Sequence, residues 1–133
     1  MFTSTDWGNL MRVLRMQTEA GKINWTESPE STRGSKITLM MMDRQQGVMS
    51  ATVGNNHFRL GSADLDDREP YFLEVTRSGP AQVTDAIRSD TARRDPDLYK
   101  VARELEMLMK AARRFVHMKG RVVEDIISDL DNL

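Results

Sequence analysis

The chain has 133 residues, a formal net charge of -1 and no cysteine. This length predicts a single domain, residues 1–133, with a hydrophobic core of its own. The near-zero charge gives no overall attraction to nucleic acid or to an anionic membrane, and the missing cysteine excludes disulfides, cysteine-ligated zinc and a cysteine nucleophile. The N-terminus has no basic segment before an apolar run and no window holds 18 apolar residues, so we expect no signal peptide, no membrane span and a cytoplasmic location.

The first predicted element is a helix over about residues 5–20. The residues of its core-facing side recur at helical spacing; they are Trp7, Leu10, Met11, Leu14 and Thr18. Ser4, Thr5 or Asp6 can cap its first amides, and Gly21 suits its C-terminal end because glycine adopts a left-handed conformation readily.

The middle of the chain predicts an antiparallel meander of about five or six strands. Apolar alternation and turn residues place these strands at residues 23–26, 36–42, 48–53, 57–60, 71–77 and 82–87. Gly54-Asn55-Asn56 and Ser78-Gly79-Pro80 are turn signals, residues 27–35 and 61–70 read as loops, and residues 88–95 read as a polar connection. Together with a helix at each end, this order predicts an α+β fold.

Residues 96–133 form the C-terminal helical element, with Pro96 suited to its first turn. An apolar stripe at helical spacing runs from Leu98 to Leu133 and stays in phase across Gly120. A continuous helix of this length would measure about 54 Å, whereas a compact domain of 133 residues spans only about 36 Å. Either the element breaks near Gly120 and its second half folds back, or one long helix docks on a second subunit.

Charge is sorted along the same element. Five basic residues and no acid occur between residues 110 and 121, and four acids and no base occur between residues 122 and 133. These blocks either pair with each other between antiparallel subunits or serve only as a solvated face. The residues predicted to form a partner interface are Leu105, Met109, Ala112, Val116, Val122, Ile126 and Leu130.

The basic block is the best candidate for nucleic-acid binding. Phosphate contacts from Lys110, Arg113, Arg114 and Lys119 would give salt-dependent binding without sequence preference. No recognisable nucleic-acid motif accompanies these residues, and Glu104 and Glu106 dilute their charge.

Signals for catalysis or a metal are weak. The two histidines, His57 and His117, lie on different predicted elements without a metal-binding partner nearby in sequence, and the acidic residues 64–69 do not match a calcium loop. Phosphate-binding glycine motifs, zinc-protease motifs and the nucleophile elbow are all missing from the sequence. We therefore predict no enzyme, no cofactor, no catalytic residue and no metal site, and a small ligand on the methionine-rich sheet remains a third class of function.

The order of elements resembles that of small uncharacterised bacterial and phage α+β domains. The residues that carry the resemblance are Leu10 to Gly21, Trp25, Phe58 to Leu60, Tyr71 to Val75 with the Gly79 turn, and Leu98-Tyr99 through Leu130. Residues 31–43 would be an added strand. The resemblance implies the fold and transfers no activity or site. Type III secretion chaperones are also similar in size, mild acidity and α+β content, although this chain lacks their central helix between strands.

The leading hypothesis is a non-enzymatic protein-interaction module, either an adaptor, a chaperone-like protein or a regulator. We expect it to form a homodimer, or to dock on another protein, through its C-terminal helix. Nucleic-acid binding through the basic face at residues 110–121 is the alternative. Membrane binding is not expected.

Overall fold

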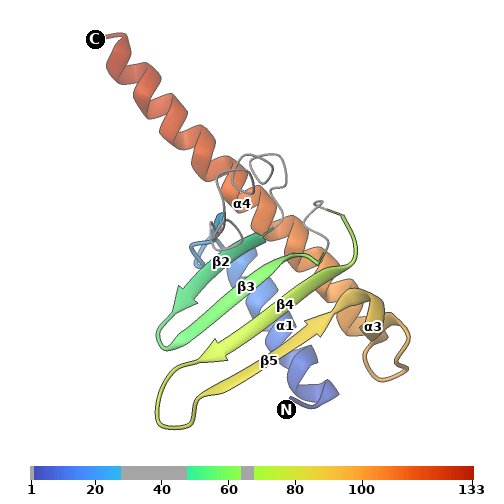
Figure 1. Ribbon diagram of the computed structural model, residues 1–133. Coiled ribbons are helices and arrows are strands. Elements are labelled where there is room, and N and C mark those ends of the chain that lie inside the picture. Colours follow the sequence, from blue (N-terminus) through green and yellow to red (C-terminus); the bar gives the residue numbers. More distant parts are fainter. Residues whose placement is uncertain (1, 28–47, 64–67) are drawn as a thin grey trace, which may run out of the picture.

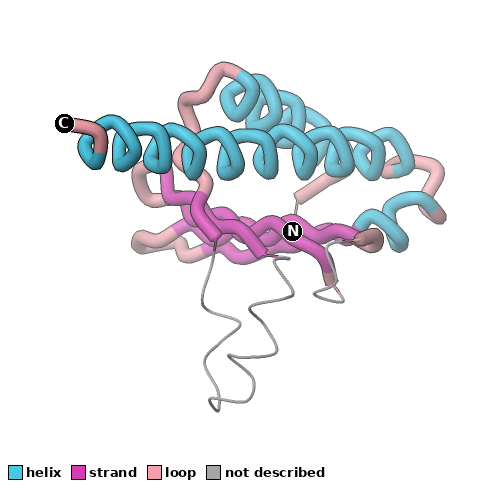
Figure 2. Tube along the Cα trace, turned by 90° about the horizontal axis from the view of Figure 1, so that it is seen from above, coloured by secondary structure: helices cyan, strands magenta, loops and turns pink. Residues whose placement is uncertain are grey.

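The computed structural model describes residues 2–27, 48–63 and 68–133. They form an α+β fold of two layers (Figure 1). One layer is a sheet of five antiparallel strands in the order β1-β2-β3-β4-β5, so that neighbours in sequence are neighbours in the sheet. The other layer consists of the N-terminal helix and the long C-terminal helix, which lie on the same face of the sheet (Figure 2). The predicted fold class is confirmed.

Helix α1 spans Ser4–Glu19 and agrees closely with the predicted helix. Its N-cap is Thr3, whose hydroxyl accepts from the Asp6 amide while the Asp6 carboxylate accepts from the Thr3 amide. This reciprocal arrangement is a capping box that begins just before the predicted cap residues. Gly21, at φ +72°, follows the C-terminus in the left-handed conformation that the sequence predicts.

The strands are β1 (Thr26–Glu27), β2 (Val48–Val53), β3 (Asn56–Ser62), β4 (Tyr71–Arg77) and β5 (Val83–Arg88). The prediction of a strand at residues 23–26 is wrong in its bounds, because Ile23 and Trp25 enter the core and only Thr26 and Glu27 pair with β2. The predicted strand at residues 36–42 and most of the acidic loop, residues 64–67, lie outside the described residues.

Hairpin geometry fixes which side chains face the helices. Val53 pairs with Asn56 across a two-residue turn in which Gly54 has φ +60°. The resulting register aligns one buried residue from each of four strands in a single row, namely Met49, Leu60, Leu73 and Ile87. Side chains on the same face of a strand are two residues apart. This row, together with the neighbouring row two residues along each strand, therefore supplies the sheet's half of the core.

Two helices follow the sheet. The predicted polar connection contains a short helix, α3 (Ser89–Arg93), in which Ser89 and Ala92 are buried. Helix α4 then spans Tyr99–Asp131 without a break at Gly120. It begins three residues after Pro96, since the Leu98 and Tyr99 amides both bond to the Asp95 carbonyl in a preceding turn. The alternative of a break with a second helix folding back is therefore wrong.

Trp25, which directly precedes β1, links the sheet to the helical layer. Its indole Nε1 donates to the Thr18 hydroxyl at 3.0 Å, and that hydroxyl donates to the Leu14 carbonyl at 2.7 Å. Both Trp25 and Thr18 are buried. Across the two helices, the Arg15 guanidinium donates to the Glu104 carboxylate at 2.6 Å, which holds α1 against α4.

Candidate protein-docking surface

Burial along α4 changes abruptly near its middle. Val101, Ala102, Leu105, Leu108, Met109 and Ala112 belong to the buried core. Phe115 and Val116 are partly buried against it, and every residue from 117 to 133 is exposed. We call residues 117–133 the projecting segment. Its helical part, residues 117–131, is about 22 Å long at 1.5 Å per residue and extends beyond the sheet in both views (Figures 1 and 2).

The projecting segment carries an apolar face. Val122, Val123, Ile126, Ile127 and Leu130 each expose 50–62% of their surface, and Leu133 exposes 99%. At 100° per residue, Val123, Ile126 and Leu130 lie on the same side of the helix as Leu105, Leu108 and Ala112. The side of α4 that faces the core therefore continues past the domain with the same chemistry. A contiguous exposed apolar surface of this kind is a candidate interaction site.

A groove lies at the root of the projecting segment. It has a volume of ≈ 540 Å³ between the C-terminal end of α1 and α4. Its apolar wall includes Ala111, Phe115, Met118, Val122 and Val123, and Thr18 and Gly21 close the α1 side. Val122 and Val123 belong to both surfaces, so the groove and the apolar face form one continuous surface.

A second cavity, of ≈ 370 Å³, lies on the sheet side of α4. Its lining mixes the basic Arg113, His117 and Arg121 with the acidic Glu27 and Glu124. Neither sign of charge dominates there, so this cavity does not have the character of an anion or a cation site.

The predicted partner-interface residues divide into two groups. Leu105, Met109 and Ala112 have no exposed surface, because α1 and the sheet already cover them. Their assignment to a partner interface is corrected: they are core residues of this fold. Val116 is half-buried at the root, whereas Val122, Ile126 and Leu130 lie on the exposed apolar face.

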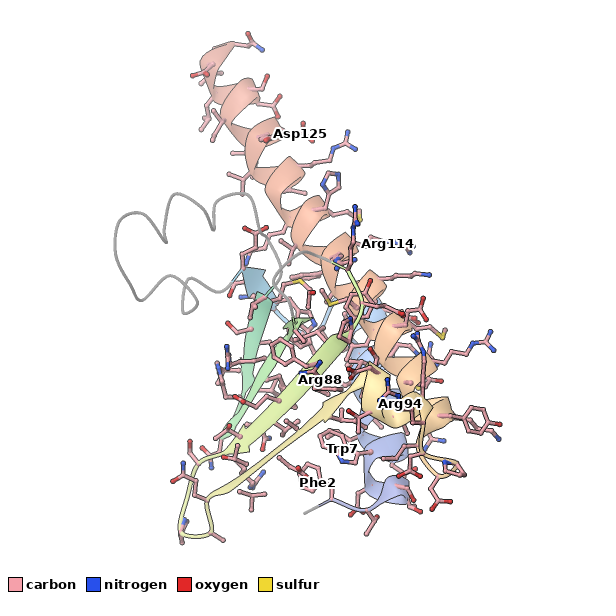
Figure 3. All side chains as sticks on the ribbon, turned by 45° about the vertical axis from the view of Figure 1, so that its right-hand side comes forward. Phe2, Trp7, Arg88, Arg94, Arg114 and Asp125 are labelled. Atoms are coloured by element: carbon pink, nitrogen blue, oxygen red, sulfur yellow. The ribbon has the colours of Figure 1, made fainter. Side chains whose placement is uncertain are left out.

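The predicted nucleic-acid residues have different neighbours in the fold. Lys110 lies 4.0 Å from the Glu106 carboxylate, the Arg113 guanidinium lies over the Tyr71 ring at 5.2 Å, and the Lys119 ammonium donates to the Asn24 side chain at 2.8 Å. Arg114 is exposed where α4 leaves the domain (Figure 3). Three of the four side chains thus have partners within the chain, and they point to different neighbours.

The end of α4 has an unfavourable charge arrangement. Its last turn contains no basic residue, and Asp129 and Asp131 lie there instead. A helix carries partial negative charge at its C-terminus, so acids in this position are destabilising by roughly 0.3–1 kcal/mol each. Cationic groups from a partner would relieve that repulsion.

Three of the groups with a shifted pKa, Glu69, Arg93 and Arg15, lie in ion pairs that join elements. Hydrogen bonds from Arg93 on α3 lower the pKa of Glu69, and the Arg93 guanidinium also lies 3.5 Å from Glu106 on α4. The hydrogen bond with Glu104 raises the pKa of Arg15. Glu104 also lines a cavity near the start of α4, beside Tyr99 and Met107. These ion pairs join α1 and α3 to α4, and α3 to the residue that precedes Pro70.

The two histidines lie apart in the fold. His57 on β3 pairs through Nδ1 with the Thr52 hydroxyl at 2.9 Å, and His117 lies on α4 beside the second cavity. Within residues 2–27, 48–63 and 68–133, no three His, Asp or Glu side chains gather as a metal site. Over the same ranges, no helix is both long and apolar enough to cross a bilayer.

Comparison of the chain with protein-family models, with curated proteins and with solved structures found no match. The periodicity of the sequence shows the apolar stripe of α4, and only the structure shows which part of that stripe is exposed. The root groove, which needs Gly21 and Thr18 beside Phe115 and Met118, depends on how α1 packs against α4 and has no signal in the local sequence.

Proposed function

We propose that this protein is a protein-interaction module that docks through the projecting segment of α4. One observation carries the proposal: a helix that is buried along its first half keeps the same apolar side exposed along residues 117–133. The role would be that of an adaptor, a chaperone-like protein or a regulator, without catalysis. The mixed charge of the second cavity and the structural ion pairs support a binding role over an enzymatic one.

Physical chemistry favours a protein partner for this surface. Burial of a Val, Leu or Ile side chain stabilises a complex by roughly 1.5–3 kcal/mol when it moves from full exposure to full burial. Six such side chains of the projecting segment are at least half exposed. An amphipathic helix that presents one apolar face is a common element of helix-mediated recognition.

Nucleic acid is less well supported as the ligand. Lys110, Arg113 and Lys119 contact groups of their own chain, and the acids of the projecting segment lie directly beyond them. A gel-shift titration at two salt concentrations distinguishes the two ligand classes. Binding that weakens steeply with salt and is lost on Arg114→Glu would favour nucleic acid.

Two double variants test the proposal. Ile126→Asp with Leu130→Asp adds two negative charges to the apolar face, and Ser128→Asp with Asn132→Asp adds the same charge to the opposite face. Neither pair contacts the domain, so both variants should fold with wild-type circular dichroism and thermal unfolding.

The readouts are sedimentation over a concentration series and crosslinking capture from extracts of the cells that make the protein. We expect the first variant to lose association, with itself or with a captured protein, and the second to retain it. If both variants associate as the wild type does, or if the wild type associates with nothing, the proposal fails.

A further inference from the structure

We propose that the projecting segment docks on the projecting segment of a second copy, antiparallel, about a twofold axis near Ile126. This inference rests on the proposed function and names its partner. Homodimers with a twofold axis use the same surface on both copies, so the surface must complement itself. The apolar face and the charge blocks of α4 meet that condition in one orientation only.

The charges select the antiparallel orientation. Lys119 and Arg121 lie in the first part of the projecting segment, and Glu124, Asp125, Asp129 and Asp131 lie in the rest. A parallel pair would place like charges side by side along its whole length, which is destabilising. An antiparallel pair places the basic part of each helix beside the acidic end of the other.

The same orientation corrects the unfavourable end of the helix. The last turn of α4 carries Asp129 and Asp131 and no basic residue. At 100° per residue, Lys119 lies on the same side of the helix as Val123, Ile126 and Leu130, and in an antiparallel pair Lys119 of each copy approaches the C-terminal turn of the other. Its positive charge then offsets both the acids and the helix dipole.

The domain sets the register. Among the described residues, the hydrogen bond from Lys119 to Asn24 is the last that joins α4 to the body of the protein. We place the end of a second helix on the core-facing side at this contact, which aligns its Leu133 with Lys119. The twofold axis then lies at the mean of 119 and 133, which is residue 126. The two copies overlap over residues 119–133, about 22 Å of helix.

This register pairs residues whose numbers sum to 252. Ile126 faces Ile126 of the second copy, Val122 faces Leu130, and Lys119 lies beside the last turn, which carries Asp129 and Asp131. On each side of Ile126, a side chain branched at Cβ therefore meets one branched at Cγ, and opposite charges lie at both ends of this row. The tip of each helix, at Leu133, reaches the apolar root groove of the other copy beside Met118 and Val122.

Single cysteines test orientation and register, because the natural chain has none. A disulfide needs Cα atoms within about 7 Å. In the proposed dimer, Ile126→Cys crosslinks with itself under mild oxidation, and the outward-facing Asp125→Cys (Figure 3) is the control that does not. The Val122→Cys variant alone should not crosslink, because its two cysteines lie about 12 Å apart along the helix axis. The same holds for Leu130→Cys alone. A mixture of the two variants should crosslink, because Val122 of one copy faces Leu130 of the other. A parallel dimer would instead crosslink at 122, 126 and 130 alike.

A charge exchange tests whether the basic start of one projecting segment lies beside the acidic end of the other. Lys119→Glu with Arg121→Glu leaves only acids on the projecting segment, and Asp129→Lys with Asp131→Lys leaves bases in both parts that meet. Each variant should weaken its own dimer by roughly tenfold or more through like-charge repulsion. Mixing the two should restore a heterodimer of wild-type affinity. Thermal unfolding should show both domains folded, with any difference between them limited to the Lys119–Asn24 hydrogen bond that Lys119→Glu removes.

The outcomes separate this inference from the proposed function. A chain that is monomeric at every concentration, yet captures another protein in a manner abolished by Ile126→Asp with Leu130→Asp, overturns the homodimer and leaves the docking surface intact. Dimers whose cysteines crosslink in the parallel pattern overturn the orientation. Loss of all association overturns both.

Discussion

Thr18 has a structural role that its residue type does not reveal. Its hydroxyl accepts from the Trp25 indole and donates to the Leu14 carbonyl in the buried core. Thr18→Val keeps the shape and leaves the indole N–H without an acceptor. We expect it to lower the free energy of unfolding by about 1–3 kcal/mol, measured by urea denaturation. Thr18→Ser retains the hydroxyl and should lower the free energy of unfolding clearly less. An equal decrease for both variants would show that the hydrogen bond is unimportant.

Glu69 gives the chain a pH-dependent element of stability. Hydrogen bonds from Arg93 lower its pKa, so the folded state holds the ionised form more strongly than the unfolded state does. This contribution is complete above the ordinary glutamate pKa, about 4.3, and is lost as the pH falls through the lowered value. Glu69→Gln should therefore be less stable than the wild type at pH 7, by roughly 0.2–1 kcal/mol as for exposed pairs.

The two proteins should converge in stability as the pH falls well below 4.3. Glu27→Gln, at an exposed carboxylate on β1, is the matched control and should follow the wild-type curve. A difference between Glu69→Gln and the wild type that does not shrink on acidification would contradict this account.

At the scale of elements, Gly120 is the residue at which the sequence leaves a broken and a continuous helix both open. The helix continues through it, and a Cβ placed there would meet nothing within 4 Å. Gly120→Ala should therefore stabilise the helix by about 1 kcal/mol. Because the projecting segment opens without unfolding the domain, the gain should appear as roughly fivefold slower amide exchange over residues 121–131 in dilute protein, with an unchanged melting temperature.

Gly120→Pro removes a helical hydrogen bond and bends or breaks α4 at the root. The domain should remain folded, since its core ends at Ala112 with Phe115 and Val116 at the margin. The association of the projecting segment should then fail. Wild-type association by this variant in sedimentation would mean that the segment does not need to be held rigidly by the domain.

The limits of β2 and β4 follow from alternation and turn residues alone, since local sterics and polar turns determine them. The buried half of α4 could not be told from the exposed half, because Leu105 and Leu130 occupy the same helical face and only tertiary packing covers one of them. For the same reason, Ala92 and Ser89 were read as connection residues, although contact with α4 and β4 orders them as α3.

At the scale of the whole molecule, α4 divides the chain into a folded domain and a projecting segment (Figure 1). The domain has its own core, so substitutions at residues 122–133 should leave its unfolding unchanged, whereas substitutions at Leu105 or Leu108 should lower its stability by about 2–5 kcal/mol for Leu→Ala. Chemical denaturation of the two sets of variants checks this separation.

The exposed helix also determines how susceptible the protein is to proteolysis. An isolated helix of about 15 residues is marginal in water, and the two residues at its base, Lys119 and Arg121, are sites where trypsin cleaves. Trypsin should cleave an undocked copy at these residues while its domain is still folded, and a docked copy should be protected from cleavage. Limited digestion at rising protein concentration would show this as a shift from the shortened domain to the intact chain. Copies without a partner would thus be removed selectively, and the amount of full-length protein in a cell would follow the amount of partner.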